Sequence, residues 1–192
     1  GDFVISKPAI TSEGNIVFGS GDEFVYCASA NDGNVIWNTK LGGSVLSDPL
    51  TSEGRVFIGC GDGKIYCLNS ASGEIVWEYQ TDGLMRQRPI LENGILYAFV
   101  RDTYIWYAID ASTGQLIWRG NANTDESLFV CGDVRPVIAN GKLWCIDAQN
   151  TRPAYLSLDT GELAWTSTLE KVSSRGMTTN GSTVFYSSNS GR

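Results

Sequence analysis

Residues 108–118 read AIDASTGQLIW, a strand-forming run followed by a glycine turn and a second run that ends in tryptophan. The same pattern recurs at 27–37 as CASANDGNVIW, at 67–77 as CLNSASGEIVW and at 157–165 as the shorter SLDTGELAW. In each copy a glycine stands four residues before the tryptophan, giving the pairs Gly33 and Trp37, Gly73 and Trp77, Gly114 and Trp118, and Gly161 and Trp165. The tryptophans are spaced by 40, 41 and 47 residues, and a period of this length indicates a repeat architecture.

The front half of each unit repeats as well, because a proline, a short apolar run and a glycine turn precede every copy. These segments read KPAITSEGNIVF, DPLTSEGRVFI, RPILENGILYA and RPVIANGKLWC, and their prolines are Pro8, Pro49, Pro89 and Pro136. Each unit therefore predicts four short antiparallel strands joined by turns. Apolar residues do not recur at helical spacing, and β-branched and aromatic residues dominate the runs, so helix is not expected.

Four antiparallel strands that recur about every 40 to 45 residues are typical of β-propeller blades. We expect an all-β propeller with four blades at about 3–41, 42–82, 83–122 and 128–169, followed by a half blade at 170–192. A β-sandwich is the alternative, but its strands would not repeat at a fixed period. A ring of about four and a half blades is incomplete, so we expect either a fragment of a longer protein or self-association through open blade edges.

The composition excludes several classes of function. The formal net charge is −7, so the surface repels phosphate backbones and nucleic acid is not an expected partner. No apolar run approaches the roughly 18 residues that a membrane-spanning helix needs, so membrane insertion is not expected. The chain has no histidine, which removes the commonest general base and the usual zinc ligands. Asp22, Asp62 and Asp102 recur where hairpins are expected, and turn chemistry explains them better than a metal site does.

Small residues stand ten positions before the tryptophans. They are Cys27, Cys67 and Ala108, with Ser157 in the fourth unit if a two-residue gap is placed before its turn. Small side chains let neighbouring sheets approach closely, so we interpret Cys27 and Cys67 as packing positions rather than redox or ligand thiols. The remaining thiols lie outside this register and are expected to be ordinary strand or loop residues: Cys60, Cys131 and Cys145.

The repeat resembles the pyrroloquinoline-quinone-type (PQQ-like) propeller family, whose docking motif runs Ala-x-Asp-x-x-x-Gly-x-x-x-Trp. The third unit matches every position of this motif, with Ala108, Asp110, Gly114 and Trp118. The first two units replace the aspartate with Ser29 and Asn69, and the fourth has Asp159 in a shortened turn. The resemblance implies that each tryptophan closes the outer strand of its blade and stacks over the glycine peptide of an adjoining blade.

Members of this family include quinone-dependent alcohol and sugar dehydrogenases, a non-catalytic outer-membrane assembly lipoprotein and sensor domains, so the fold alone does not select a function. The dehydrogenases hold their cofactor with adjacent cysteines and a calcium ion, whereas this sequence has no Cys-Cys pair. We expect a non-catalytic scaffold, without cofactor, that serves as a fragment or accessory domain and binds a protein or a small anion. The alternative is a piece of a PQQ-dependent dehydrogenase. The family also implies a periplasmic or extracellular location, whereas five cysteines without an evident pairing point the other way, to a reducing compartment.

Two groups of residues are candidate binding contacts. The residue before the front proline, or at the matching place of the half blade, is a cation in four units: Lys7, Arg88, Arg135 and Arg175. If the first strand of each blade is innermost, these side chains lie near one mouth of the central channel and attract an acidic peptide or small anion. Solvated rim residues are the alternative. The fourth unit carries an insertion, CIDAQNTRPAYLS, in which Arg152 and Tyr155 are candidate partner contacts, unless it is simply a longer loop.

Overall fold

The computed structural model describes residues 3–4, 6–100, 102–103, 105–121, 136–146, 153–167 and 177–186. This part of the chain contains eighteen β-strands and no helix, so the expected all-β fold is confirmed. The described residues accordingly include no helical segment with the length and apolar character needed to cross a membrane.

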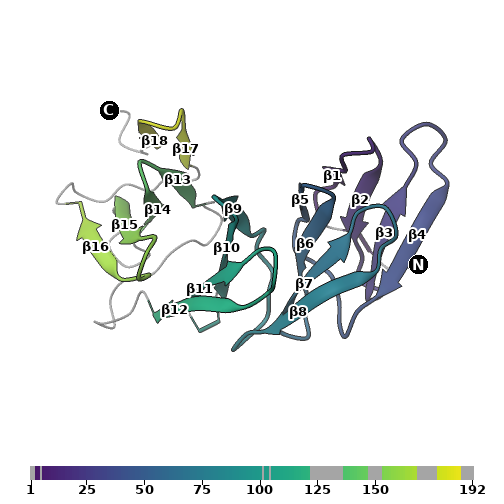
Figure 1. Cartoon of the computed structure of the whole chain (residues 1–192), viewed down its shortest axis with the longest axis horizontal. Helices are drawn as coiled ribbons and strands as arrows, with labels where there is room; N and C mark the ends of the chain where they lie inside the picture. Colours follow the sequence, from purple (N-terminus) through teal and green to yellow (C-terminus); the bar gives the residue numbers. More distant parts are fainter. Residues whose placement is uncertain are drawn as a thin grey trace. The chain divides into compact units, whose positions relative to one another are not determined.

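The strands form four four-stranded antiparallel sheets and one two-stranded piece, and each sheet follows chain order (Figure 1). The first two sheets contain β1 (Ala9–Ile10), β2 (Ile16–Gly19), β3 (Phe24–Ala28) and β4 (Val35–Lys40), and then β5 (Leu50–Ser52), β6 (Arg55–Gly59), β7 (Lys64–Asn69) and β8 (Ile75–Gln80). The next two contain β9 (Ile90–Glu92), β10 (Ile95–Val100), β11 (Ile105–Asp110) and β12 (Leu116–Asn121), and then β13 (Val137–Ala139), β14 (Lys142–Ile146), β15 (Pro153–Ser157) and β16 (Leu163–Thr166). The two-stranded piece pairs β17 (Met177–Thr179) with β18 (Val184–Tyr186). These sheets are consistent with partial propeller blades.

The chain divides into two compact units, the first made of residues 1–103 and 109–116 and the second of 104–108 and 117–192. In the first unit, buried side chains of the first two sheets pack in one cluster that includes Val17, Val25, Val56, Ile58 and Leu68. In the second unit, the buried side chains of the fourth sheet include Leu143, Cys145, Ala154 and Leu156. The middle strands read as unbroken apolar runs because both of their faces are buried.

A tryptophan on the last strand of one sheet docks on the glycine turn of the next sheet. Trp37 donates its Nε1–H to Ser70 O at 2.9 Å, and its ring covers Gly73, where a Cβ atom would come within 2.5 Å of the indole. Two further junctions repeat this geometry, with Trp77 over Gly114 and Trp118 over Gly161. Their indoles donate to Ala111 O at 3.0 Å and to Leu158 O at 2.7 Å. The stacking that the motif implies is therefore confirmed at these three junctions.

Two members of the motif stand outside these junctions. A Cβ atom added to Gly33 would meet nothing within 4 Å, although its φ of +74° matches that of Gly114. Trp165 is 41% exposed, whereas Trp37 is 8% exposed. Among the described residues, Gly33 is thus a docking turn without an indole, and Trp165 is an indole without a docking turn.

The gap expected in the fourth unit is wrong. Tyr155 pairs with Trp165, as Cys27 pairs with Trp37 and Cys67 with Trp77. The turn keeps its full length, because Gly161 N donates to Ser157 O at 2.9 Å in the way that Gly73 N donates to Asn69 O. Ser157 therefore stands where the third unit has Asp110, and a tyrosine takes the small-residue position. Tyr155 is accommodated because its ring stacks on Trp165, with centroids 5.7 Å apart.

The interpretation of Cys27 and Cys67 as packing residues is confirmed, because both side chains have no exposed surface. Cys60 and Cys145 are also buried, and Cys131 lies outside the described residues. Burial disfavours the thiolate, so it raises the pKa of Cys67 to about 11 and that of Cys60 to about 11. Thiols in such surroundings are poor nucleophiles at neutral pH.

A pair of matched substitutions tests the docking junction. Gly33→Ala and Gly73→Ala each place a Cβ at a positive φ, which destabilises by about 1–2 kcal/mol. Only Gly73→Ala also drives that atom into the Trp37 ring, which we expect to lower the free energy of unfolding by about 1–3 kcal/mol more. Urea unfolding of both variants gives the comparison. Equal losses in the two variants would show that the indole does not press on this turn.

Site-resolved labelling with iodoacetamide tests the packing of the thiols. At pH 8 a thiol of pKa about 11 is only about one-thousandth ionised, so we expect Cys60 and Cys67 to label at least 100-fold more slowly in the native protein than in guanidinium. Because an unfolded thiol has a pKa of about 8.5, the stability conferred by the neutral buried thiols is present below that pH. This stability is lost as the pH rises from about 8.5 towards 11.

In the labelling experiment, modification of Cys60 and Cys67 in the native protein at the rate of the unfolded protein would contradict their assignment as buried packing residues.

Candidate functional site

The residues before the front prolines of the first two sheets lie side by side. Lys7 donates its backbone N–H to Asp48 Oδ1 at 2.7 Å, and Thr51 Oγ1 donates to Ile10 O at 2.8 Å between β5 and β1. Lys7 and Arg88 have exposed side chains. The other two cations of this group lie outside the described residues: Arg135 and Arg175. A binding role for the four cations stays a prediction.

The structure places Tyr155 within strand β15 rather than in the loop before it. Its half-buried ring stacks on Trp165 and lies 5.0 Å from the Trp144 ring, centroid to centroid. The Nζ atom of Lys142 stands 4.3 Å from the centroid of the tyrosine ring, a distance at which a cation is attracted to an aromatic face. Arg152 lies outside the described residues, so only Tyr155 of this pair is placed.

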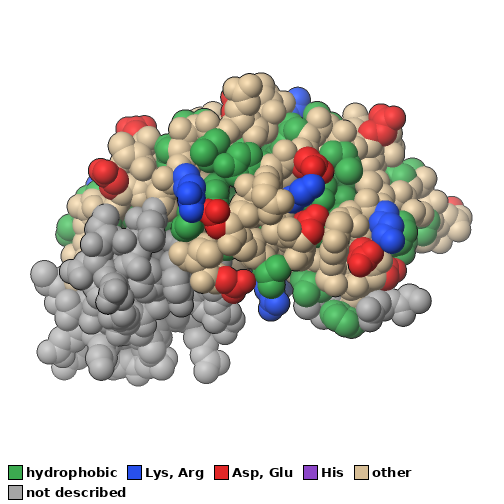
Figure 2. Space-filling model, turned by 90° about the horizontal axis from the view of Figure 1, so that it is seen from below, with side chains coloured by type: hydrophobic (Ala, Val, Ile, Leu, Met, Phe, Trp, Pro, Cys, Tyr) green, Lys and Arg blue, Asp and Glu red, His purple; other side chains and the backbone are tan. Residues whose placement is uncertain are grey.

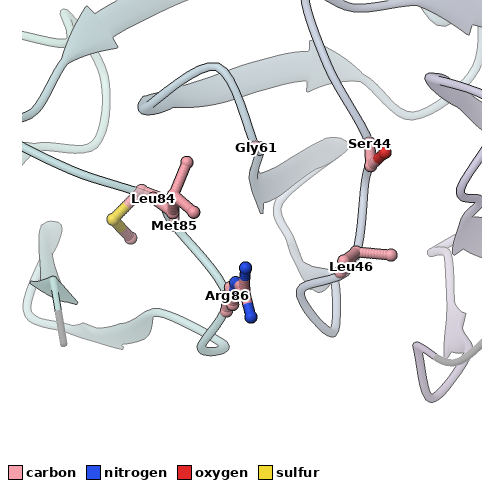
Figure 3. A pocket seen from close by; sticks show the side chains of 6 residues that line it. All are labelled: Ser44, Leu46, Gly61, Leu84, Met85 and Arg86. Carbon is pink, nitrogen blue, oxygen red and sulfur yellow. The ribbon is translucent and has the colours of Figure 1, made fainter. Parts of the chain in front are cut away.

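A hollow of about 230 Å³ opens in the first unit between two connecting segments, β4 to β5 and β8 to β9. Its lining residues are Ser44, Leu46, Gly61, Leu84, Met85 and Arg86. Figure 3 shows Ser44 and Leu46 on one side and the Leu84–Arg86 segment on the other, with Gly61 between them. Arg86 is exposed, whereas Met85 is 1% exposed. The hollow is therefore largely apolar, with one guanidinium at its rim.

Hydrogen bonds hold the walls of this hollow in place. Gly61 N donates to Ser44 O at 2.9 Å, and Met85 N donates to Cys60 O at 3.2 Å. Ser44 Oγ donates to Gly21 O at 3.1 Å, which ties the same segment to the first sheet. Backbone groups make most of these contacts, so the fold holds the two connecting segments in place around the hollow.

The size and chemistry of the hollow limit what it can bind. Small-molecule sites usually occupy about 300–1,000 Å³, so a hollow of about 230 Å³ is better matched to a side chain of a partner protein. A guanidinium stays charged at all physiological pH values and favours carboxylates. Arg86 does not stand out in the sequence, because Leu46 and Arg86 lie three residues before Pro49 and Pro89 and not next to these prolines.

The hairpin aspartates bond to their own turns. Asp62 Oδ1 accepts a hydrogen bond from Lys64 N at 3.0 Å, and its Oδ2 accepts one from the Tyr66 hydroxyl. Asp22 makes the equivalent bonds to Phe24 N and to the Tyr26 hydroxyl. Burial and the bond to Asp62 raise the pKa of Tyr66. Within the described residues, carboxylate and thiol side chains do not gather in a group of three that would hold a metal ion.

Comparison with known proteins shows which family and which solved structures this chain is similar to. The family model described as outer membrane protein assembly factor BamB matches residues 4–62 and 51–192. BamB from Moraxella catarrhalis has a similar structure, with a TM-score of 0.73 and 24% identity over 99% of this chain and 57% of that protein. A quinohemoprotein alcohol dehydrogenase from Comamonas testosteroni is also similar, with a TM-score of 0.71 and 16% identity over 96% of this chain and 39% of the enzyme.

A computationally designed protein, Ika8, is also similar, with a TM-score of 0.67 and 15% identity over 92% of this chain and 53% of the design. The chain thus spans little more than half the length of BamB. No curated protein matches the sequence. At these identities the solved structures show the fold alone, whereas the family model matches nearly the whole chain. The chain therefore belongs to the PQQ-like β-propeller repeat family described by the outer membrane protein assembly factor BamB.

Proposed function

We propose that the chain is a non-catalytic propeller module that binds an acidic segment of a partner protein. The observation that carries the proposal is the hollow between the two connecting segments, with its fixed backbone walls and the exposed Arg86 at its rim. Leu46 and Leu84 offer apolar contact inside it, and the guanidinium pairs with a carboxylate of the partner. An apolar anchor flanked by a charge pair is a common arrangement at protein interfaces.

The charged side chains near the hollow indicate the charge of the partner segment. Arg88 lies two residues after Arg86 on the same connecting segment, and its side chain is also exposed. On the face shown in Figure 2, acidic and basic side chains of the described residues are interspersed. With a formal net charge of −7, the chain attracts an acidic partner only locally, through this pair of arginines, and not through a long-range field.

The family supplies a context for this binding. Because the matching model is described as an outer membrane protein assembly factor, we propose a location in the cell envelope outside the cytoplasm. We propose that its partner is an outer-membrane protein during assembly or a component of the assembly machinery. The similarity to a quinohemoprotein alcohol dehydrogenase rests on 16% identity and carries the fold only, so it does not favour a redox role.

Charge reversal at the hollow tests this function. The probe is a fluorescently labelled outer-membrane β-barrel protein, diluted unfolded from urea, and binding is followed by fluorescence anisotropy. We expect Arg86→Glu to weaken binding about tenfold, because it replaces an attraction for carboxylates with a repulsion. Lys40→Glu is the matched control, since Lys40 makes a surface ion pair with Glu23 at 3.3 Å on the outer strand β4.

Two results would contradict the proposal. If Arg86→Glu bound the probe as well as the unaltered chain, the hollow would not be the binding site. If the chain reconstituted with pyrroloquinoline quinone and calcium reduced a dye in the presence of an alcohol, the module would be catalytic. We expect no calcium-dependent dye reduction.

A further inference from the structure

The hollow between the two connecting segments has a counterpart one blade earlier in the same unit. Phe3 and Ser44 each stand five residues before the front proline of their blade, so Phe3 is the repeat equivalent of Ser44. The backbone makes the same contact at both places. Gly21 N donates to Phe3 O at 3.0 Å, and Gly61 N donates to Ser44 O at 2.9 Å.

The two places differ in what covers the glycine. A Cβ atom added to Gly21 would meet the Phe3 ring, with Cζ at 3.2 Å and Cε2 at 3.3 Å. The three atoms nearest to a Cβ added at Gly61 are all backbone atoms of Ser44. A ring of the chain itself therefore covers the first glycine, whereas the second lines the open hollow of about 230 Å³.

Aromatic rings over glycine peptides recur in this chain. The indoles of three tryptophans lie on glycine turns at the blade junctions, in addition to the phenyl ring over Gly21. A flat ring can lie against a glycine because no side chain holds it away, and it brings a large apolar surface to the contact. The serine at position 44 is too small to supply such a surface.

The hollow has the size and the lining that a ring needs. An apolar cavity of about 150 Å³ is large enough to hold benzene, and this hollow has about 230 Å³. Leu46 and Leu84 supply apolar contacts, and the wall includes Met85, whose side chain is 1% exposed. Thioether groups make favourable contacts with aromatic rings.

We propose that the side chain that a partner inserts into this hollow is aromatic, and that its ring lies over the Gly61 peptide as the Phe3 ring lies over Gly21. A carboxylate next to the aromatic residue pairs with Arg86 at the rim. The recognised segment is thus an aromatic residue beside an acidic one. This inference rests on the proposed function, because it names the side chain that the same hollow binds.

Two short peptides test the choice of side chain. They have the sequences GSGFDGSG and GSGLDGSG, so they differ only in the phenylalanine or leucine before the aspartate. Binding to the whole chain is followed by NMR titration of the backbone amides, which detects weak complexes. We expect the phenylalanine peptide to bind about fivefold more tightly. Only this peptide is expected to shift the Gly61 amide resonance through the ring current.

Filling the hollow from within the chain gives an independent test. Ser44→Phe places in the second blade the residue that the first blade carries, so the ring enters existing space and the fold is retained, which urea unfolding checks. We expect this variant to bind the phenylalanine peptide about tenfold more weakly. Asn38→Phe adds the same ring at an exposed position of β4. It is the matched control and leaves the affinity unchanged.

Several results would overturn the aromatic anchor. These are equal affinity of the two peptides, no binding of either, an unshifted Gly61 amide, or full affinity in a folded Ser44→Phe chain. Concentration-dependent dimerisation that Phe3→Ser abolishes would also overturn it, because the occupant would then be the Phe3 ring of a second copy, which is 56% exposed.

The failure of the proposed function gives a different result. In that case Arg86→Glu leaves binding of the labelled β-barrel protein unchanged, whatever the peptides do. If Arg86→Glu weakens binding of the barrel protein while the two peptides bind equally, the hollow is the binding site and its anchor is not aromatic.

Discussion

The docking of an indole on a glycine peptide is the interaction on which the rest of this structure depends. A single four-stranded blade cannot bury its apolar faces alone, so neighbouring blades have to cover them. The tryptophan supplies a large apolar surface, and its N–H is satisfied by a carbonyl of the next sheet at 2.7–3.0 Å. Glycine is required at the other side, because any Cβ would meet the ring. Each junction thus combines apolar burial, a hydrogen bond and a backbone conformation that only glycine adopts readily.

The sequence predicted most of this architecture because the junction leaves a periodic trace. The spacing identifies the tryptophan and the glycine of each junction, together with the strand pattern between them: Trp37 and Gly73, Trp77 and Gly114, and Trp118 and Gly161. The register of the fourth sheet cannot be identified in this way. The rule of a small residue opposite the tryptophan led to a gap between Ser157 and its turn, whereas an aromatic stack lets Tyr155 take the position opposite Trp165. Whether a large residue fits there depends on its stacking partners, which periodicity does not reveal.

The candidate site was less accessible from the sequence. The cations before the prolines were visible as a pattern, but the backbone of Lys7 bonds to Asp48, and the hollow is lined by Arg86 instead. The hollow forms because connecting segments from successive blades come together, and a single repeat contains no sign of it. The proposed binding site thus lies at a boundary between repeats, where the connecting segments of successive blades leave a small space that a partner can fill.

The most direct test of the central claim is a double-mutant cycle on the first junction, with Trp37→Ala, Gly73→Ala and the double variant compared by urea unfolding. If the indole rests on the glycine turn, removing the ring relieves the clash made by the new Cβ, and we expect a coupling free energy of about 1–3 kcal/mol. If the two single variants' losses in the free energy of unfolding add up to that of the double variant within about 0.5 kcal/mol, the two residues do not interact. That result would contradict the account of how the blades are joined.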